Sequence, residues 1–312
     1  MGLRIVGWGT ALPEKILTNH DLEAQLDTSD EWIRERTGIR ERRIGDSTAD
    51  LAIEAGREAL EHAGVDPASI DMLVLCTTTP DQTVPATSAS VHEALGIGGG
   101  AFDLNAACAG FVYGLVTAES LLASNPEKHI LLVGADVLSR ITDWTDRSTA
   151  VLFGDGAGAV VLQGCSDEDG QLLASDVGAD GSLRGILYAD LGGKMKMEGP
   201  EVFKCAVRAM VASSKRVLKS AGCSAEEIAL LVPHQANLRI IEAACQRLGI
   251  PVERAAIVLD RTGNTSSASI PLALIDAIRA DRLVDEDLVL LTGFGAGMTW
   301  ASAVVRWRVS AR

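Results

Sequence analysis

The sequence repeats its own plan, and this repeat restricts the fold more than any other feature does. Ala63–Val74 aligns with Ala221–Val232, because each segment ends a helix with Ala-Gly, crosses an acidic loop and enters an apolar strand. Ala94–Ile97 recurs as Arg247–Ile250, and in both the glycine lies where a helix would end. The spacing between matching segments varies, which is typical of a duplicated domain with unequal loops and not of a repeat array.

A glycine-rich run, Phe153–Val161, has a partner in Phe294–Val305, and we expect each to form a β-hairpin. In both halves, apolar strands alternate with amphipathic helices. The predicted strands are Met72–Thr77, Ile130–Gly134 and Leu288–Thr292, and the predicted helices are Ala49–Ala63, Val202–Ala221 and Leu238–Leu248. This alternation favours an α/β protein with two duplicated mixed-sheet halves, residues 1–170 and 171–312. Stacking of the halves through central helices would give five α/β/α/β/α layers.

Composition and charge exclude several classes of protein. The 312 residues carry a formal net charge of −14, which argues against a nucleic-acid-binding protein. We find no export signal and no apolar run of membrane-spanning length, so we expect a cytoplasmic protein without a membrane partner. The six cysteines form no C-x-x-C pair and have no histidine at metal-ligand spacing, so we expect neither a metal site nor a disulfide framework.

Positive charge is concentrated in one part of this acidic chain. Between residues 204 and 261, nine Lys and Arg residues stand against five Asp and Glu residues. Such a stretch is either an ordinary solvated surface or a place where an acidic partner docks.

Cys108 is the strongest candidate for a reactive side chain. The run Phe102–Phe111 reads as a short strand followed by a helix start, with small residues on both sides of the cysteine. At a helix N-terminus, the dipole and the free amides would stabilise a thiolate, and small neighbours would let a substrate approach. The alternative is a buried, unreactive cysteine in a tight crossover.

Two further residues have the chemistry to act with this thiol. His234 follows the apolar strand Ile228–Val232 and begins a helix, so we expect it at the counterpart of the Cys108 crossover in the second half. Asn264 lies in a run of small polar residues before the helical segment Ile270–Arg279. The alternative for His234 is a hydrogen-bonded polar residue at a strand end, without a catalytic role. The alternative for Asn264 is a residue that only helps to cap a helix. Together with Cys108 they permit either a Cys-His hydrolase or a condensing enzyme.

Six segments, in order and over nearly the full length, resemble the thiolase-fold condensing enzymes, and within them the β-ketoacyl-acyl carrier protein synthase III family. The matching segments are Asp27–Ile33, Arg36–Ile39, Ala106–Phe111, Phe153–Gly158, Val232–Ile240 and Thr262–Ser266. The resemblance implies a thiolase-like fold, a homodimer and the initiating condensation of fatty-acid synthesis, with acyl-CoA and malonyl-acyl carrier protein as substrates and no cofactor.

The resemblance also implies roles for individual residues. Cys108 would carry the acyl group, and His234 and Asn264 would stabilise the malonyl thioester as it loses CO2. The backbone amides of Cys108 and of Ala296–Gly297 would form an oxyanion hole, which Phe294 would shield. The positions that match the family's CoA channel are Trp32 and Arg147 at the adenine, with Thr28, Arg36, Gly199, Phe203 and Asn237 along the pantetheine. The positions expected to face the carrier protein are Gln235, Ala236, Asn237, Leu238, Arg239, Lys204, Arg208 and Arg247.

The chain departs from the family pattern at three places. Val84 stands where acetyl-preferring relatives have phenylalanine, a residue that closes the acyl pocket across the dimer, so we expect tolerance for longer or branched primers. Pro200 removes an amide N–H beside the CoA channel. The loop Asp180–Lys196 is shorter than in well-known relatives, so we expect a more open entrance.

Other functions stay open from the sequence alone. The same chemistry could start a polyketide or alkylquinolone pathway, which a different carrier protein would reveal. A non-catalytic acyl-binding partner subunit is a different class, and the presence of Cys108 argues against it.

Overall fold

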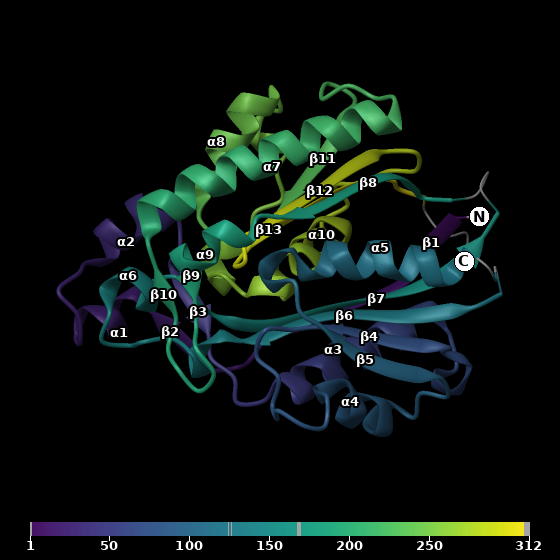
Figure 1. Ribbon diagram of the computed structural model, residues 1–312, viewed down its shortest axis with the longest axis horizontal. Coiled ribbons are helices and arrows are strands. Elements are labelled where there is room, and N and C mark those ends of the chain that lie inside the picture. The colour runs from purple at the N-terminus through teal and green to yellow at the C-terminus, as the bar shows by residue number, and fades with distance from the viewer. Residues whose placement is uncertain (1, 124, 126, 167–169, 309–312) are drawn as a thin grey trace.

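Two mixed β-sheets with helices on both faces make up the computed structural model, which describes residues 2–123, 125, 127–166 and 170–308. From bottom to top, Figure 1 shows helices, a sheet, central helices, a second sheet and a final helical layer. This confirms the thiolase-like α/β/α/β/α architecture expected from the repeat.

The lower sheet has five strands. In spatial order they are β1 (Gly2–Ala11), β7 (Asp155–Cys165), β6 (His129–Val137), β4 (Met72–Cys76) and β5 (Gly100–Leu104). Strand β4 is parallel to β5 and β6, and β7 is antiparallel to β6 and β1. Strands β4, β6 and β7 are almost entirely buried because helices cover both faces of this sheet.

The upper sheet has four strands with the same plan. In spatial order they are β11 (Ile228–Pro233), β12 (Leu288–Gly295), β13 (Thr299–Arg306) and β8 (Leu172–Ala179). Here β11 is parallel to β12, and β13 is antiparallel to β12 and β8. The order and directions match those of β4, β6, β7 and β1. The place of β5 is taken by an isolated parallel bridge between Leu231 and Ala255.

Six long helices complete the layers, two in each helical layer. Helices α5 (Gly110–Leu122) and α10 (Ser269–Arg279) lie between the sheets, α3 (Thr48–Ala63) and α4 (Thr87–Leu95) cover the lower sheet, and α7 (Gly199–Ala221) and α8 (Leu238–Leu248) cover the upper sheet. The glycines that the repeat places at helix ends do end them, because Gly64 and Gly222 adopt left-handed backbone conformations after α3 and α7.

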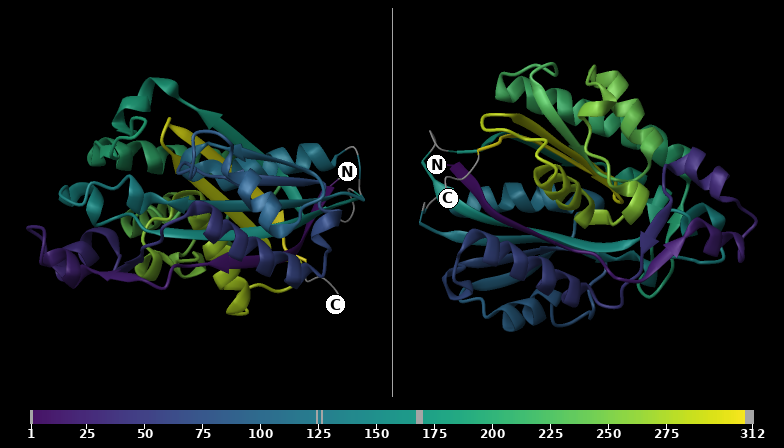
Figure 2. Two further views of the ribbon diagram at one scale, coloured as in Figure 1. Left: turned by 90° about the horizontal axis from the view of Figure 1, so that it is seen from below. Right: turned by 180° about the vertical axis from the view of Figure 1, so that it is seen from behind.

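Short elements surround one end of the molecule. They are α1 (Asn19–Glu23), α2 (Asp30–Thr37), α6 (Arg147–Ala150), α9 (Leu259–Thr262) and the two-stranded pairs β2 (Ile16–Thr18) with β3 (Glu41–Arg43) and β9 (Leu187–Tyr188) with β10 (Lys196–Met197). The right-hand view of Figure 2 shows the purple α1–α2 segment beside the green α8. The Asn237 side chain joins them by donating to the Arg36 carbonyl over 3.0 Å.

One expected hairpin is wrong. Phe294–Val305 does form a hairpin, β12–β13, but Phe153–Val161 runs into the single central strand β7. The glycines of this run allow close packing and do not form a turn. A Cβ added to Gly158 would lie 2.8 Å from the Pro271 side chain on α10.

The expected counterpart of the Cys108 crossover is also wrong. Cys108 lies between β5 and α5, whereas His234 follows β11, whose counterpart by strand order is β4. The true counterpart is the turn before α10. Each turn is a 3₁₀ turn, Ala107–Ala109 or Ser266–Ala268, and its first residue has a positive φ, 48° at Ala107 and 50° at Ser266.

Candidate active site

A cavity of ≈ 980 Å³ is lined by side chains from both halves of the chain. The six predicted catalytic and oxyanion positions on its wall are Cys108, His234, Asn264, Phe294, Ala296 and Gly297. Residues more than 180 positions apart in the sequence thus share one wall. The fold brings them together because β5, β11 and β12 each end at this cavity.

Cys108 sits in the 3₁₀ turn that leads into α5. Burial raises the pKa of its thiol to about 12, and a hydrogen bond with Ser266 acts in the opposite direction. The expected stabilised thiolate is therefore not the resting form, because desolvation outweighs the helix N-terminus. In the free protein, Cys108 is a neutral thiol near pH 7.

His234 is buried and held at three points. Its backbone N–H donates to the Thr292 carbonyl over 2.8 Å, and its Nδ1 lies 2.6 Å from the Ser269 hydroxyl. The Phe294 ring meets it edge-on, with centroids 5.4 Å apart. Burial lowers the pKa of the imidazole to about 3, so the ring is neutral at physiological pH. When Ser269 donates to Nδ1, the ring proton lies on Nε2, which becomes a hydrogen-bond donor.

Asn264 is fixed by its backbone and by one side-chain oxygen. Its N–H donates to the Leu152 carbonyl over 2.8 Å, and its own carbonyl accepts from Gly154 over 3.0 Å. The side-chain Oδ1 accepts the N–H of Ser266 over 2.9 Å. Since Oδ1 is engaged in the turn, the Nδ2 group is the part of this amide suited to donate to a substrate.

The β12–β13 hairpin approaches Cys108 closely. A Cβ added to Gly295 would lie 2.5 Å from the Cys108 backbone nitrogen. Any larger residue at 295 would collide with this amide. Glycine therefore leaves the Cys108 N–H accessible, as an oxyanion hole requires.

The same cavity holds most positions expected to bind CoA. These are Trp32, Arg36, Arg147, Gly199, Phe203 and Asn237. The Arg147 guanidinium carbon lies 4.8 Å from the Trp32 ring centroid, and that of Arg36 lies 5.9 Å away. Thr28 is not among the lining residues, and its buried hydroxyl oxygen has no hydrogen-bond partner among the described residues.

The expected carrier-protein positions separate into two groups. Lys204, Ala236, Asn237 and Arg239 line the cavity, and Arg208 and Arg247 are exposed outside it. Leu238 is half-buried. The remaining position needs correction.

Gln235 does not face a partner. Its side chain is fully buried, where Nε2 donates to the carbonyls of Pro233 and Ala256 and Oε1 accepts the N–H of Val258. These bonds satisfy backbone groups at the end of β11 and in residues 256–258, which is a structural role.

Val84 lies outside the cavity wall formed by this chain and is 84% exposed. Pro200 lines the cavity and lies in the first turn of α7, where a proline costs no helical hydrogen bond. Within Asp180–Lys196, Arg184, Tyr188 and Met195 line the cavity.

Three polar residues in or beside the turn before α10 were missed by the sequence analysis. Ser266 bonds to the Cys108 thiol, Ser269 to His234, and the fully buried Asp136 to Ser267. The serines fall in a run that reads as an ordinary helix cap. Asp136 had a clearer signal, because it is a lone carboxylate inside the apolar run of β6.

Neither a metal centre nor a membrane span is found in the part of the chain that the structure describes. No group of three or more His, Cys, Asp or Glu side chains there is arranged to hold a metal ion. None of the described helices combines the length and apolar character needed to cross a bilayer.

Comparison with known proteins places this cavity in a family. Residues 102–181 match the model of 3-oxoacyl-[acyl-carrier-protein] synthase III, and residues 218–307 match the model of its C-terminal part. A β-ketoacyl-[acyl-carrier-protein] synthase III of Roseiflexus sp. is 51% identical, covering 97% of this chain and 98% of the relative. One from Geobacillus kaustophilus is 50% identical, covering 98% and 99%.

Solved structures agree. The 3-oxoacyl-[acyl-carrier-protein] synthase III of Aquifex aeolicus superposes with a TM-score of 0.95 at 46% identity, covering 98% of this chain and all of the other. The priming β-ketosynthase of the R1128 polyketide pathway is similar at 36% identity, with a TM-score of 0.93, covering 99% and 97%.

Proposed function

The chain belongs to the 3-oxoacyl-[acyl-carrier-protein] synthase III family, and from this we infer that it is the acyltransferase that initiates fatty-acid synthesis. It condenses an acyl-CoA primer with malonyl-acyl carrier protein. The observation that supports this activity most directly is that Cys108, His234 and Asn264 line one cavity with Trp32 and Arg147.

In the first step, the Cys108 sulfur attacks the thioester carbon of acyl-CoA. The carbonyl oxygen takes up negative charge, and the accessible N–H of Cys108 together with the Ala296–Gly297 hairpin supports it. The bond from carbon to the CoA sulfur then breaks. The thiol proton leaves Cys108 as the new bond forms, since a free thiolate is disfavoured by burial, and it ends on the departing CoA sulfur.

In the second step, malonyl-acyl carrier protein loses CO2, and the electron pair of the broken carbon–carbon bond moves onto the thioester oxygen. His234 Nε2–H and Asn264 Nδ2–H donate to this oxygen and lower the barrier, by about 10²–10³ in rate for each donor. The resulting carbanion attacks the acyl-cysteine to give a 3-oxoacyl product. The bond from the acyl carbon to the Cys108 sulfur breaks, and this sulfur takes up a proton from solvent as it leaves, which restores the neutral thiol.

Variants of the two donors test these roles. His234→Ala and Asn264→Ala should still accept an acyl group on Cys108 but should lose most malonyl decarboxylation, measured as CO2 release. If acyl loading falls as much as decarboxylation does, the assignment of His234 and Asn264 to the second step is incorrect.

The positive side chains beside the cavity are suited to the carrier protein, which is acidic. Arg239 lies over the Phe203 ring, with its guanidinium carbon 5.8 Å from the ring centroid, and it lines the cavity together with Lys204. Arg208 and Arg247 extend the charge outside. A phosphopantetheine arm could therefore reach Cys108 while the protein that carries it stays on this surface.

Val84 is proposed to act in a homodimer, where it would close the partner's acyl pocket. Its exposure supports this, because an apolar side chain that is 84% exposed is available to another copy of the chain. A small side chain there leaves room for primers longer or more branched than acetyl. Measurement of kcat/KM for acetyl-, isobutyryl- and octanoyl-CoA tests the proposal, and a steep preference for acetyl-CoA would refute it.

The choice of carrier protein distinguishes fatty-acid initiation from the alternative, initiation of a polyketide or alkylquinolone pathway. Among the solved structures, the polyketide priming synthase is 36% identical to this chain, against 46% for the Aquifex aeolicus 3-oxoacyl-[acyl-carrier-protein] synthase III and 31% for another enzyme of that name. We propose that the chain acts in the cytoplasm on the carrier protein of fatty-acid synthesis, because the relatives that are 50–51% identical over nearly its whole length are β-ketoacyl-[acyl-carrier-protein] synthases III. A preference for a polyketide carrier protein in side-by-side assays would reverse the assignment.

A further inference from the structure

We propose that Asp136 is a positioning residue for the condensation, because it holds the turn that presents Asn264 and Ser266 to Cys108. Asp136 lies near the end of β6 and is fully buried. The proposal rests on the function given to Asn264 above. It concerns a residue that touches neither substrate nor the reacting sulfur.

One oxygen of Asp136 is hydrogen-bonded to the 3₁₀ turn Ser266–Ala268, which we call the catalytic turn. Oδ2 accepts the backbone N–H of Ser267 over 3.0 Å and the Ser267 hydroxyl over 2.6 Å. The preceding residue, Ser266, has a positive φ of 50°, which a residue with a side chain adopts only when its surroundings impose it. Asn264 Oδ1 holds the Ser266 N–H from one side of this strained residue, and Asp136 holds the next N–H from the other.

The other oxygen of Asp136 accepts hydrogen bonds from the loop after β4, which forms another part of the cavity wall. Oδ1 accepts the Thr78 N–H over 2.7 Å and the hydroxyls of Thr78 and Thr79 over 2.9 and 3.0 Å. Thr78 lines the cavity. The carboxylate therefore ties the loop after β4 to the turn before α10, two segments nearly 190 residues apart.

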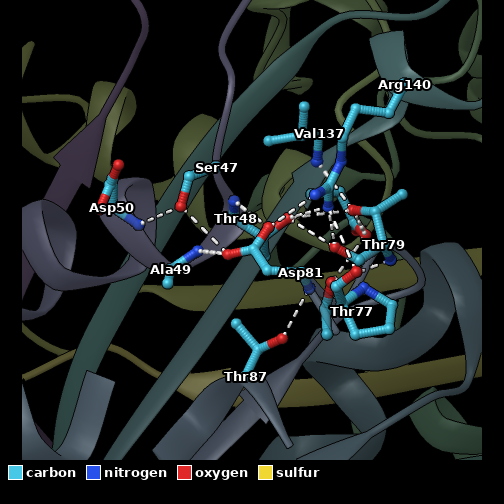
Figure 3. Close-up of polar contacts among 12 residues, drawn as sticks. Ser47, Thr48, Ala49, Asp50, Thr77, Thr79, Asp81, Thr87, Val137 and Arg140 are labelled. Atoms are coloured by element: carbon cyan, nitrogen blue, oxygen red, sulfur yellow. Dashed lines mark hydrogen bonds and ion pairs between the residues drawn. The ribbon is translucent and has the colours of Figure 1, made fainter. Parts of the chain in front are cut away.

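The loop after β4 is itself anchored on its far side, which makes it a firm support. Figure 3 shows Thr79 and Asp81 around the Arg140 guanidinium, with Asp81 also bonded to Thr48 and Ala49 at the start of α3. Asp81 accepts these two backbone N–H groups over 3.0 and 2.8 Å and pairs with Arg140 at 2.7 Å. Asp136 thus connects the catalytic turn to a network that is fixed at several points.

The internal repeat provides a second, independent observation. Gly134 on β6 and Gly293 on β12 are equivalent, since a Cβ on either would contact a carbonyl, that of Ser267 or that of Cys108. Two residues further along, β6 has Asp136 and β12 has Gly295. The Asp136 carboxylate accepts the Ser267 N–H in the turn before α10, whereas Gly295 has no side chain to accept the Cys108 N–H. The turn before α10 is thus fixed by a side chain, and the Cys108 N–H stays available to a substrate.

The test compares Asp136→Asn with Asp155→Asn, a matched control on the neighbouring strand. Asp155 is equally buried and accepts the Gly45 N–H and the Ser139 N–H and hydroxyl, but it has no hydrogen bond to the catalytic turn or to the loop after β4. Decarboxylation of malonyl-acyl carrier protein and acylation of Cys108 are measured separately for both variants, with thermal unfolding as the check on stability.

We expect Asp136→Asn to lower kcat for decarboxylation by about tenfold or more at nearly unchanged KM, because a displacement of about 1 Å costs that much or more. Acylation of Cys108 should fall far less, and Asp155→Asn should affect neither. Ser267→Ala keeps the carboxylate but removes the hydroxyl, which lies 2.6 Å from Asp136 Oδ2 and 2.7 Å from the Cys76 carbonyl oxygen. It should show the same kcat effect more weakly, and it provides the test if Asp136→Asn does not fold.

Equal losses in the two aspartate variants, or an unchanged kcat in Asp136→Asn or in Ser267→Ala, would overturn the proposal. Asn264→Ala separates this failure from failure of the proposed function. If Asn264→Ala leaves decarboxylation intact, the role of Asn264 is wrong. If Asn264→Ala abolishes it while Asp136→Asn does not, only the positioning role is wrong.

Discussion

The Arg147 guanidinium stacks on the Trp32 indole, with 4.8 Å between the guanidinium carbon and the ring centroid. An adenine ring between them would need about 3.5 Å on each face, or about 7 Å in all. The proposed adenine site therefore requires Arg147 to move away from Trp32, which would break its 2.7 Å hydrogen bond to the Asp27 carbonyl. The two side chains expected to hold adenine are therefore in contact with each other, and their role at CoA stays a prediction.

Removing the indole should weaken binding of the nucleotide end of CoA. We expect Trp32→Ala to raise KM for acyl-CoA by about tenfold, because stacking of a base on an aromatic ring contributes about 1–3 kcal/mol. Acyl-pantetheine, which has no adenine, is the control and should be used equally by both enzymes. An equal rise in KM for acyl-pantetheine would mean that Trp32 supports the fold and does not bind adenine.

Cys108 should react with a simple electrophile as a thiol of very high pKa. Burial raises this pKa to about 12, so the thiolate fraction, and with it the rate of alkylation by iodoacetamide, should rise about tenfold per pH unit from pH 6 to 10. Cys108→Ser gives the background from the other cysteines. A rate that levels off near pH 7 would show a stabilised thiolate in the free enzyme and would contradict the neutral resting state.

Burial of neutral His234 should make stability depend on pH. Its pKa is lowered to about 3 in the folded chain, against an ordinary value of 6.5, so below pH 6.5 the unfolded chain binds a proton that the folded chain does not. The wild type should therefore lose stability relative to His234→Gln as pH falls from 6.5 towards 3, by about 1.4 kcal/mol per unit. Urea unfolding at pH 7 and pH 5 measures this difference, and parallel pH curves for the two proteins would refute it.

Reversal of charge at Arg239 should impair the carrier protein alone. We expect Arg239→Glu to raise KM for malonyl-acyl carrier protein about tenfold, since an acidic partner would meet a like charge, while acylation of Cys108 by acyl-CoA stays intact. Lys219→Glu makes the same change on exposed α7 away from the cavity and serves as the control. Equal effects of the two variants, or equal losses in both half-reactions, would argue against docking at Arg239.

The layers of the fold could be predicted because they depend on short-range patterns. Apolar periodicity and terminal glycines located the main helices to within a few residues, as at Leu238–Leu248. The division of the chain at residue 170 stays a prediction. Glycines at 154, 156 and 158 misled because a glycine required for close packing, against Thr262 at position 154 and against α10 at positions 156 and 158, looks the same as a glycine in a turn.

The catalytic residues could be named from motifs, but their protonation states could not. The high pKa of Cys108 and the low pKa of His234 both arise from burial by residues distant in sequence. Gln235 was expected to face the carrier protein because the resemblance implies that role for the whole segment 235–239, whereas the turn after β11 points its side chain inward. Asp136 acts across the two halves, and only the folded chain reveals its contacts.

The most direct test of the account is to locate the acyl group during turnover. The enzyme is incubated with an acyl-CoA, digested and mapped by mass spectrometry, and malonyl-acyl carrier protein is then added. We predict one acyl group on Cys108 that disappears as 3-oxoacyl-carrier protein forms, and no acylation of Cys108→Ser. An acyl group on another cysteine, or one on Cys108 that is released only as free acid, would contradict the condensing mechanism.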